Sequence, residues 1–280
     1  MKKKLSLLLT LTISAAMLFT ACTKKNDSTN ENASGNKGTF KVGMECGYAP
    51  FNWTQMKNTN GAVKIQGSSE YAGGYDVEIA KKIADSMGKE LVIVKTKWEG
   101  LLPALTSGKI DAIIAGMSPT AERKESIDFS DNYYTSNLVM VVKKGGKFDG
   151  ASSIQDFSGA KITAQLNTFH YTVIDQINGV SKQTAMADFP TMRVALESGK
   201  IDGYVSERPE GVSAQTANSK FKMIEFKEGF KTSPEDTAVA VGVVKNSALT
   251  EQINKALAKI SEDQRKEIMD NAIKNQPAAQ

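Results

Sequence analysis

The sequence contains one pattern twice. ALTSGKIDA at 104–112 recurs as ALESGKIDG at 195–203. Each copy has the pattern of an apolar helix, a glycine that ends it and a strand beginning Ile-Asp. The repetition predicts two lobes built on one plan, each presenting a strand end to a crevice shared with the other. The alternative is chance similarity of a common helix-to-strand connection.

The elements around these copies indicate an α/β fold. A helical apolar face runs from Tyr75 to Gly88, with Asp76 as its expected cap, and the strand LVIVKTK follows at 91–97. Strands that alternate with helices over short links imply right-handed crossovers and a mostly parallel sheet. A strand at 133–144 then leads into GGKFDGASS, a composition break that predicts the first crossing between lobes.

The end of the chain is expected to return to the first lobe. A strand at 233–245 and one amphipathic helix at 249–273 form this return. The predicted lobes are therefore 39–142 with 238–280, and 143–237. Two hinge strands join them, and such a pair can absorb a rotation while each lobe stays rigid.

The first residues have the plan of a secretory signal. Lysines at 2–4 precede an apolar stretch at 5–19, and small residues then lead to Cys22. We expect a signal peptide at 1–21 and a flexible polar tether at 22–38. An ordinary cleaved signal with a chance cysteine is the alternative.

Charge and cysteine content exclude several classes of function. The formal net charge is +4, and removal of the three leader lysines lowers it to +1, so we expect no nucleic acid or polyanion as partner. Cys46 is the one cysteine beyond the leader and Cys22, so no internal disulfide is expected if Cys22 is acylated. No spacing of His, Cys or Asp suits a metal, no glycine-rich phosphate loop is present, and we expect no cofactor.

Chemistry-bearing residues follow the two repeated strands. After the apolar run 110–115, Gly116, Ser118 and Arg123 lie around the start of an expected helix. A guanidinium and free amide hydrogens at a helix start can hold a carboxylate, although a lone arginine there is also typical of a solvated surface. The second strand reaches Glu207, so one lobe offers donors and the other an acceptor.

Two further strand ends carry polar residues. Glu45 and Tyr48 lie where the first strand breaks, and Asn167 with Thr168 forms a turn whose neighbouring amide hydrogens point beyond the strand end. His170, the one histidine, is expected to be structural or to line the cleft.

From about Phe40 to its end, the chain resembles the solute-binding proteins of ABC importers for polar amino acids. The resemblance is carried by YAPFNW, GGYDVEIAKKIA, WEGLLPALTSGKIDAIIAGMSPTAERKESIDFSDNYY and SGKIDGYVSERP. It implies a two-lobed periplasmic-binding-protein-like fold of type II and a monomer. Cys22 resembles the lipidated cysteine of bacterial lipoproteins, whose acyl groups, palmitate among them, would anchor the protein in the lipid bilayer on the extracellular face of a Gram-positive-type cell membrane.

The resemblance also implies roles for individual residues. Arg123 would bind the α-carboxylate of the ligand with the backbone at Ser118 and Thr168. Glu207, where many relatives have Asp, would bind the α-ammonium with the Ser118 hydroxyl and the Gly116 carbonyl.

Further roles concern the ligand side chain. Tyr48 and Trp98 would form aromatic walls on either side of it, and Glu45 would meet its far end. Gln165 begins the turn after the first strand of the second lobe, where Asn167-Thr168 departs from the glycine-threonine of many relatives.

These roles favour a cationic side chain, because aromatic faces and a carboxylate stabilise a desolvated cation by on the order of 2 kcal/mol or more. Arginine or lysine is the expected ligand, delivered to an ABC permease. Glutamine, another neutral polar amino acid or cystine is the alternative.

A dehydratase on the same fold and a surface adhesin or sensory protein are rivals from other classes. We expect no enzyme, because no catalytic set beyond ordinary binding groups is present.

Overall fold

Two five-stranded sheets carry the described part of the chain, residues 38–277 of the computed structural model. In order across the first sheet, its strands are β6 (Glu90–Lys95), β1 (Thr39–Met44), β7 (Ala112–Ile113), β14 (Ala238–Val244) and β8 (Ile127–Thr135). β1 is parallel to β6 and β7, whereas β14 is antiparallel to β7 and β8. The helices α1 (Tyr75–Ser86) and α2 (Trp98–Thr106) precede β6 and β7, as parallel pairing requires.

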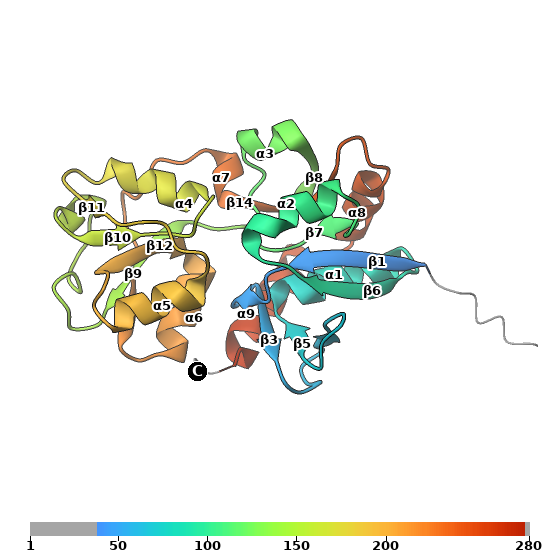
Figure 1. The fold of residues 1–280 in the computed structure, drawn as a ribbon, viewed down its shortest axis with the longest axis horizontal. Coiled ribbons are helices and arrows are strands. Elements are labelled where there is room, and N and C mark those ends of the chain that lie inside the picture. The colour runs from blue at the N-terminus through green and yellow to red at the C-terminus, as the bar shows by residue number, and fades with distance from the viewer. Residues whose placement is uncertain (1–37, 278–280) are drawn as a thin grey trace, which may run out of the picture. The chain divides into compact units, whose positions relative to one another are not determined.

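The second sheet repeats this arrangement. In order, its strands are β11 (Ser181–Lys182), β10 (Lys161–Thr163), β12 (Gly203–Glu207), β9 (Leu138–Lys143) and β13 (Phe221–Ile224). β10 is parallel to β11 and β12, and β9 is antiparallel to β12 and β13. Figure 1 shows β9, β10 and β12 together in one part of the ribbon and β1 and β6 in the other.

The repeated sequence occupies the same place in both sheets. α2 leads into β7, and α5 (Phe189–Glu197) leads into β12. The aspartate of each Ile-Asp pair makes the same two bonds to the neighbouring strand. The amide of Lys41 donates to Asp111 Oδ2 and that of Lys161 to Asp202 Oδ2, both at 2.8 Å, and each aspartate amide donates back to the same lysine carbonyl. The Asp therefore extends the pairing before the strand begins.

A third sheet and several short helices complete the fold. The small sheet has the order β2 (Gly47–Tyr48), β3 (Asn52–Gln55), β5 (Tyr71–Gly73) and β4 (Val63–Lys64), and it lies between β1 and α1 in the chain. The remaining helices are α3 (Ala121–Ser126), η1 (Ile154–Phe157), α4 (Phe169–Thr172), η2 (Val173–Gln176), α6 (Arg208–Ala217), α7 (Pro234–Thr237), α8 (Leu249–Leu257) and α9 (Glu262–Asn275).

The first crossing between the sheets was placed too late by the expected lobe boundary at 142/143. β9 belongs to the second sheet, so the chain changes sheets at Ser136 and Asn137, between β8 and β9. The glycine-rich segment after β9 remains on the second-sheet side, where the amide of Lys144 donates to the carbonyl of Lys220. Composition marked a turn there, but it carried no information on which sheet the preceding strand joins.

The return to the first sheet also differs in detail. The expected strand at 233–245 begins as the short helix α7, which Ser233 and Asp236 cap reciprocally, before β14 starts at Ala238. The expected single helix at 249–273 is two helices, because Ser261 and Gln264 form a capping box that starts α9.

Two smaller expectations were wrong. The apolar run 110–115 is buried, but only Ala112 and Ile113 pair as a strand. Asp76 does not cap α1; the cap position is Gly74, and Asp76 is fully buried within a hydrogen-bond network.

The buried apolar residues form two clusters. The larger is built around Phe40, Val42 and Ile113 of the first sheet and continues through Phe189 and Tyr204 on the side of the second. The smaller lies on the side of the second sheet alone and includes residues of β9, β10 and η1. The larger cluster therefore joins the two sides.

We expect replacement of Gly74 by alanine to destabilise the protein strongly. Gly74 has φ 123° and ψ 178°, a region restricted to glycine, and a Cβ there would overlap the carbonyl oxygen of Phe51. The free energy of unfolding, measured by urea denaturation, should fall by about 2–5 kcal/mol. Gly67→Ala is the matched control, because Gly67 has φ 72° with open space around its Cβ, and it should cost about 1–2 kcal/mol. Equal losses for the two variants would contradict the steric argument.

Candidate ligand-binding site

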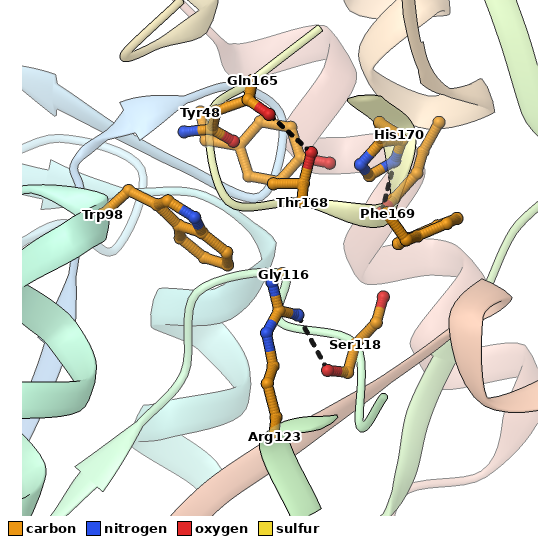
Figure 2. Close-up of a pocket in the computed structure, with 10 residues that line it drawn as sticks. Tyr48, Trp98, Gly116, Ser118, Arg123, Gln165, Thr168, Phe169 and His170 are labelled. Atoms are coloured by element: carbon orange, nitrogen blue, oxygen red, sulfur yellow. Dashed lines mark hydrogen bonds and ion pairs between the residues drawn. The ribbon is translucent and has the colours of Figure 1, made fainter. Parts of the chain in front are cut away.

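One cavity is lined from both sheets (Figure 2). Its lining residues on the side of the first sheet are Tyr48, Trp98, Gly116, Ser118 and Arg123. Those on the side of the second are Gln165, Thr168, Phe169, His170 and Glu207. The structure thus brings together eight of the nine ligand-binding residues expected from the sequence and adds Phe169 and His170. Glu45 is the one expected residue that does not line the cavity.

The two repeated strands bring opposite charges to this cavity. Gly116 and Ser118 follow β7, and Thr120 caps α3, which carries Arg123. Glu207 is the last residue of β12 and is 3% exposed. A buried anion therefore stands at the end of one strand, and a cation lies in the first turn of the helix that follows the other.

The guanidinium of Arg123 is held by main-chain carbonyls and an aromatic face. It donates from Nη1 to the Ser118 carbonyl at 2.9 Å and from Nη2 to the Asn167 carbonyl at 3.1 Å, and it lies 5.0 Å from the Trp98 ring centroid. Burial lowers its pKa to about 10, so it stays charged near neutral pH. Among the described residues no carboxylate forms an ion pair with it, which leaves a cation that attracts an anion.

Glu207 faces the imidazole of His170 across 3.5 Å, from Oε1 to Nε2. Its second oxygen, Oε2, has no hydrogen-bond partner within the part of the chain that the structure describes. Tyr48 lines the same cavity, where burial raises the pKa of its phenol well above the usual value and the charge of Glu207 adds to that rise. An acceptor with an unused oxygen suits a cationic group of a ligand.

The turn after β10 links the cavity to Glu45. The Gln165 amide donates to Glu45 Oε1 at 2.9 Å and to the Ala187 carbonyl at 3.1 Å, while the Thr168 hydroxyl donates to the Gln165 carbonyl at 2.7 Å. Asn167 accommodates the turn with φ 57°, a conformation that asparagine tolerates. Glu45 therefore touches the cavity only through Gln165.

Burial of Glu45 raises the pKa of its carboxyl to about 8, although the hydrogen bond from Gln165 opposes the rise. The charges of Asp188, Glu99 and Asp76 raise it further. Glu45 Oε2 has no hydrogen-bond partner among residues 38–277. The groups that act on Glu45 are therefore acidic, so a cation would be favoured beside it.

The Ser118 hydroxyl donates to the Asp236 carbonyl at 2.8 Å. The hydroxyl hydrogen is therefore already engaged, and only the oxygen lone pairs remain for a ligand. This arrangement allows Ser118 to accept a hydrogen bond from a ligand but not to give one.

Aromatic rings pack across the two sheets beside the cavity. Tyr48 stacks on Phe51 at 4.9 Å and on Phe189 at 4.5 Å, with planes 9° apart in the second pair. Gly116 allows Tyr48 to lie close, because a Cβ at this residue, whose φ is 62°, would come within 2.5 Å of the ring. Phe189 was not among the residues expected at the site, because its only local signal is its place after Asp188, which caps α5.

Asp76 connects two strand ends beneath the site. Its Oδ1 accepts from the Tyr133 hydroxyl at 2.7 Å, and that hydroxyl accepts from the Gly116 amide at 3.3 Å. Its Oδ2 accepts from the Asn52 amide at 2.8 Å, and Asn52 Oδ1 accepts from the Cys46 amide at 2.7 Å. Burial raises the pKa of Asp76 to about 7. The backbone on both sides of the cavity is thus positioned by one carboxyl group.

The cavity is small, at about 10 Å³, which is room for about one water molecule. A ligand the size of an amino acid therefore enters only when the surrounding side chains or the two sheets move apart. A cation and an anion on opposite sheets can then hold a small molecule that carries both charges.

No group of three or more His, Cys, Asp or Glu side chains arranged to hold a metal ion occurs in the part of the chain that the structure describes. No helix in residues 38–277 has the length and apolar character needed to cross a membrane. Cys22 lies outside these residues.

The chain is similar to known proteins over most of its length. The family model for bacterial extracellular solute-binding proteins, family 3, matches residues 40–274. A probable histidine-binding protein of Campylobacter jejuni is 34% identical over 211 residues, covering 70% of this chain and 75% of that protein. The arginine-binding extracellular protein ArtP of Bacillus subtilis is 29% identical over 268 residues, covering 94% of each chain.

A solved structure resembles this one closely. It is an amino acid ABC transporter substrate-binding protein from Streptococcus pneumoniae bound to L-arginine, with a TM-score of 0.75 and 27% identity. The match covers 85% of this chain and 94% of that one. It agrees with the two-lobed fold expected from the sequence.

We expect the stability of the protein to depend on the protonation of Glu45. The carboxyl pKa rises from 4.5 to about 8 on folding, so the stabilisation is complete below about pH 4.5 and is lost as the pH rises through about 8. Between pH 5 and pH 8 the free energy of unfolding of the wild type should fall by roughly 1–3 kcal/mol relative to Glu45→Gln, measured by urea denaturation at each pH. A difference between the two proteins that stays constant over this range would contradict the prediction.

Proposed function

Because the chain belongs to the bacterial extracellular solute-binding proteins of family 3, we propose that it captures an amino acid with a cationic side chain, arginine or lysine, and delivers it to an ABC permease. The ligand is held between two lobes that close around it. The protein acts by binding, and its ligand leaves unchanged.

The observation that carries this proposal is the pair of charges facing one cavity. Arg123, free of any described carboxylate, suits an α-carboxylate, and Glu207, with its unpartnered Oε2, suits an α-ammonium. The Gly116 carbonyl and the lone pairs of Ser118 add acceptors for the ammonium, and the backbone at Ser118 and Thr168 adds donors for the carboxylate. To bind a carboxylate, Arg123 exchanges its bond to the Asn167 carbonyl for one to the ligand.

Acidic surroundings support a cationic ligand side chain. Glu45 lies behind Gln165 with Asp188 and Glu99 nearby, and Tyr48 and Trp98 supply aromatic faces. A guanidinium or ammonium beside Glu45 would stabilise its ionised form and relieve the repulsion among these carboxylates. The relatives named for arginine are consistent with this choice.

A neutral polar amino acid, glutamine or cystine, is the second candidate. One observation favours it. With a pKa of about 8, the Glu45 carboxyl is mostly protonated at neutral pH and can pair with an uncharged amide. Histidine, named for one relative, also fits, because its side chain can be cationic or neutral while the Glu45 carboxyl can be ionised or protonated.

Closure follows from the two crossings. Ser136 of the first crossing donates its amide to the carbonyl of Thr237 in the second at 2.9 Å, so the crossings lie side by side. Bending there rotates one sheet against the other and opens the cavity, and it separates the stacked rings of Tyr48 and Phe189. We propose that the closed, ligand-bound form is the one that the permease recognises.

The anchor and the rival functions complete the proposal. Acylation of Cys22 would hold a monomer at the extracellular face of the membrane, with the polar segment 22–38 as tether. A dehydratase on this fold would convert its ligand, whereas the proposed protein releases the bound amino acid intact. Mass spectrometry of the released ligand distinguishes the two functions.

We expect Arg123→Ala to weaken amino acid binding severely. Loss of one member of a buried charged pair costs roughly 2–5 kcal/mol, so the Kd for L-arginine should rise by about 30-fold to several thousand-fold in calorimetry. Lys124→Ala is the matched control, because it removes the same charge from the same helix at an exposed position. It should change the Kd by less than about 2-fold. Arg123→Ala binding like the wild type would refute the carboxylate clamp.

We expect Glu45→Gln to separate the two candidate ligand classes. At pH 8, affinity for L-arginine should fall by about 30-fold or more, while affinity for L-glutamine changes by less than about 3-fold. In the wild type, L-arginine should bind more tightly as the pH rises from 6 to 8, because a cation requires the ionised carboxyl and its pKa is about 8. Tight glutamine binding with no measurable arginine binding would favour the second candidate.

A further inference from the structure

His170 is a buried histidine without hydrogen bonds inside the candidate site. It is 6% exposed, and neither Nδ1 nor Nε2 has a hydrogen-bond partner among residues 38–277. The ring lies against Phe169 with centroids 4.3 Å apart and lines the cavity (Figure 2). Buried polar atoms of this kind are normally satisfied, so two orphaned nitrogens indicate a partner that binds from the cavity.

The nearest charged group is Glu207. Its Oε1 lies 3.5 Å from Nε2, just beyond hydrogen-bonding distance, and its Oε2 is also unpartnered within the described chain. Both side chains are less than a tenth exposed. Three orphaned polar atoms are therefore gathered at the place proposed for the ligand ammonium.

Apart from Glu207, no titratable group on the elements packed against His170 is paired with its imidazole among residues 38–277. α4 packs against η2 and β12. On η2, Asp175 is paired with Lys182 at 2.9 Å, and on β12 the groups are Glu207 itself and Tyr204, whose hydroxyl donates to Glu210 at 3.0 Å. Across the cavity lie the cation of Arg123 and the phenol of Tyr48.

We propose that His170 belongs to the ammonium subsite and competes with the ligand for Glu207. This inference rests on the proposed function. When the imidazole is neutral, Glu207 is free to take the ammonium, and a ring nitrogen can accept a further hydrogen bond from it. When the imidazole is protonated, it pairs with Glu207, and the two cations contend for one carboxylate.

The consequence is capture that weakens in acid. The sequence contains a single histidine. Wherever its ring is protonated, ligand binding has to displace one proton, so the Kd should rise by up to about tenfold for each unit by which the pH falls. Because every α-amino acid carries the same ammonium, the effect is expected for cationic and neutral ligands alike.

The test compares His170→Gln with the wild type. Kd values for L-arginine are measured by calorimetry from pH 5 to pH 8, and the ratio of wild-type to variant Kd is taken at each pH. Glu45 titrates in both proteins, so its contribution cancels in the ratio. We expect the ratio to rise about tenfold or more between pH 7.5 and pH 5. His170→Asn, a second neutral replacement, should give the same trend, and the thermal midpoint of each protein without ligand checks that it is folded.

The possible outcomes are distinct. A ratio that stays constant from pH 5 to pH 8 in folded variants would overturn the role of His170 and leave the proposed function standing. If L-arginine does not bind the wild type, the same ratio is measured with L-glutamine and L-histidine. Failure of all three to bind at pH 7.5 would overturn the proposed function and this inference together.

Discussion

The site depends on holding a cation and an anion at one cavity without letting them neutralise each other. Arg123 is held by the carbonyls of Ser118 and Asn167 and by the face of Trp98, while the buried Glu207 faces the imidazole of His170 at 3.5 Å. Burial of such groups costs free energy unless they are paired. Under the proposed function, a zwitterionic ligand offers both partners at once, so its binding would offset the free energy lost when the two charges are desolvated.

The scaffold provides this arrangement through strand ends. In both sheets an aspartate after the glycine stop bonds to the neighbouring strand, which fixes where β7 and β12 begin. Beneath the cavity, Asp76 ties the backbone at Gly116 to that at Cys46 through Tyr133 and Asn52. A displacement of β7 or β12 would move the two charges relative to each other, and ligand binding is sensitive to small displacements of such groups.

Several expectations failed for one reason, namely that they concern pairing between distant segments. The LVMVV segment in β9 has the same apolar composition whichever sheet it joins, and only its bonds to β12 and β13 place it in the second. Asp76 has the spacing of a helix cap, but its partners Asn52 and Tyr133 are 24 and 57 residues away. By contrast, the capping box of Ser261 and Gln264 is a local signal that the sequence contains. The expectation of a single helix missed it because that expectation used only the spacing of apolar residues.

The sequence by itself determined the repeated helix-to-strand unit, the α/β class and the residue types at the strand ends, because glycine stops, apolar runs and charges are local properties. Eight of the nine expected ligand-binding residues line the cavity for that reason. Only the tertiary structure decided that Glu45 lies behind Gln165, that Phe189 stacks on Tyr48, and that His170 faces Glu207. These contacts join residues far apart along the chain, and their distances follow from how the two sheets pack rather than from any local preference.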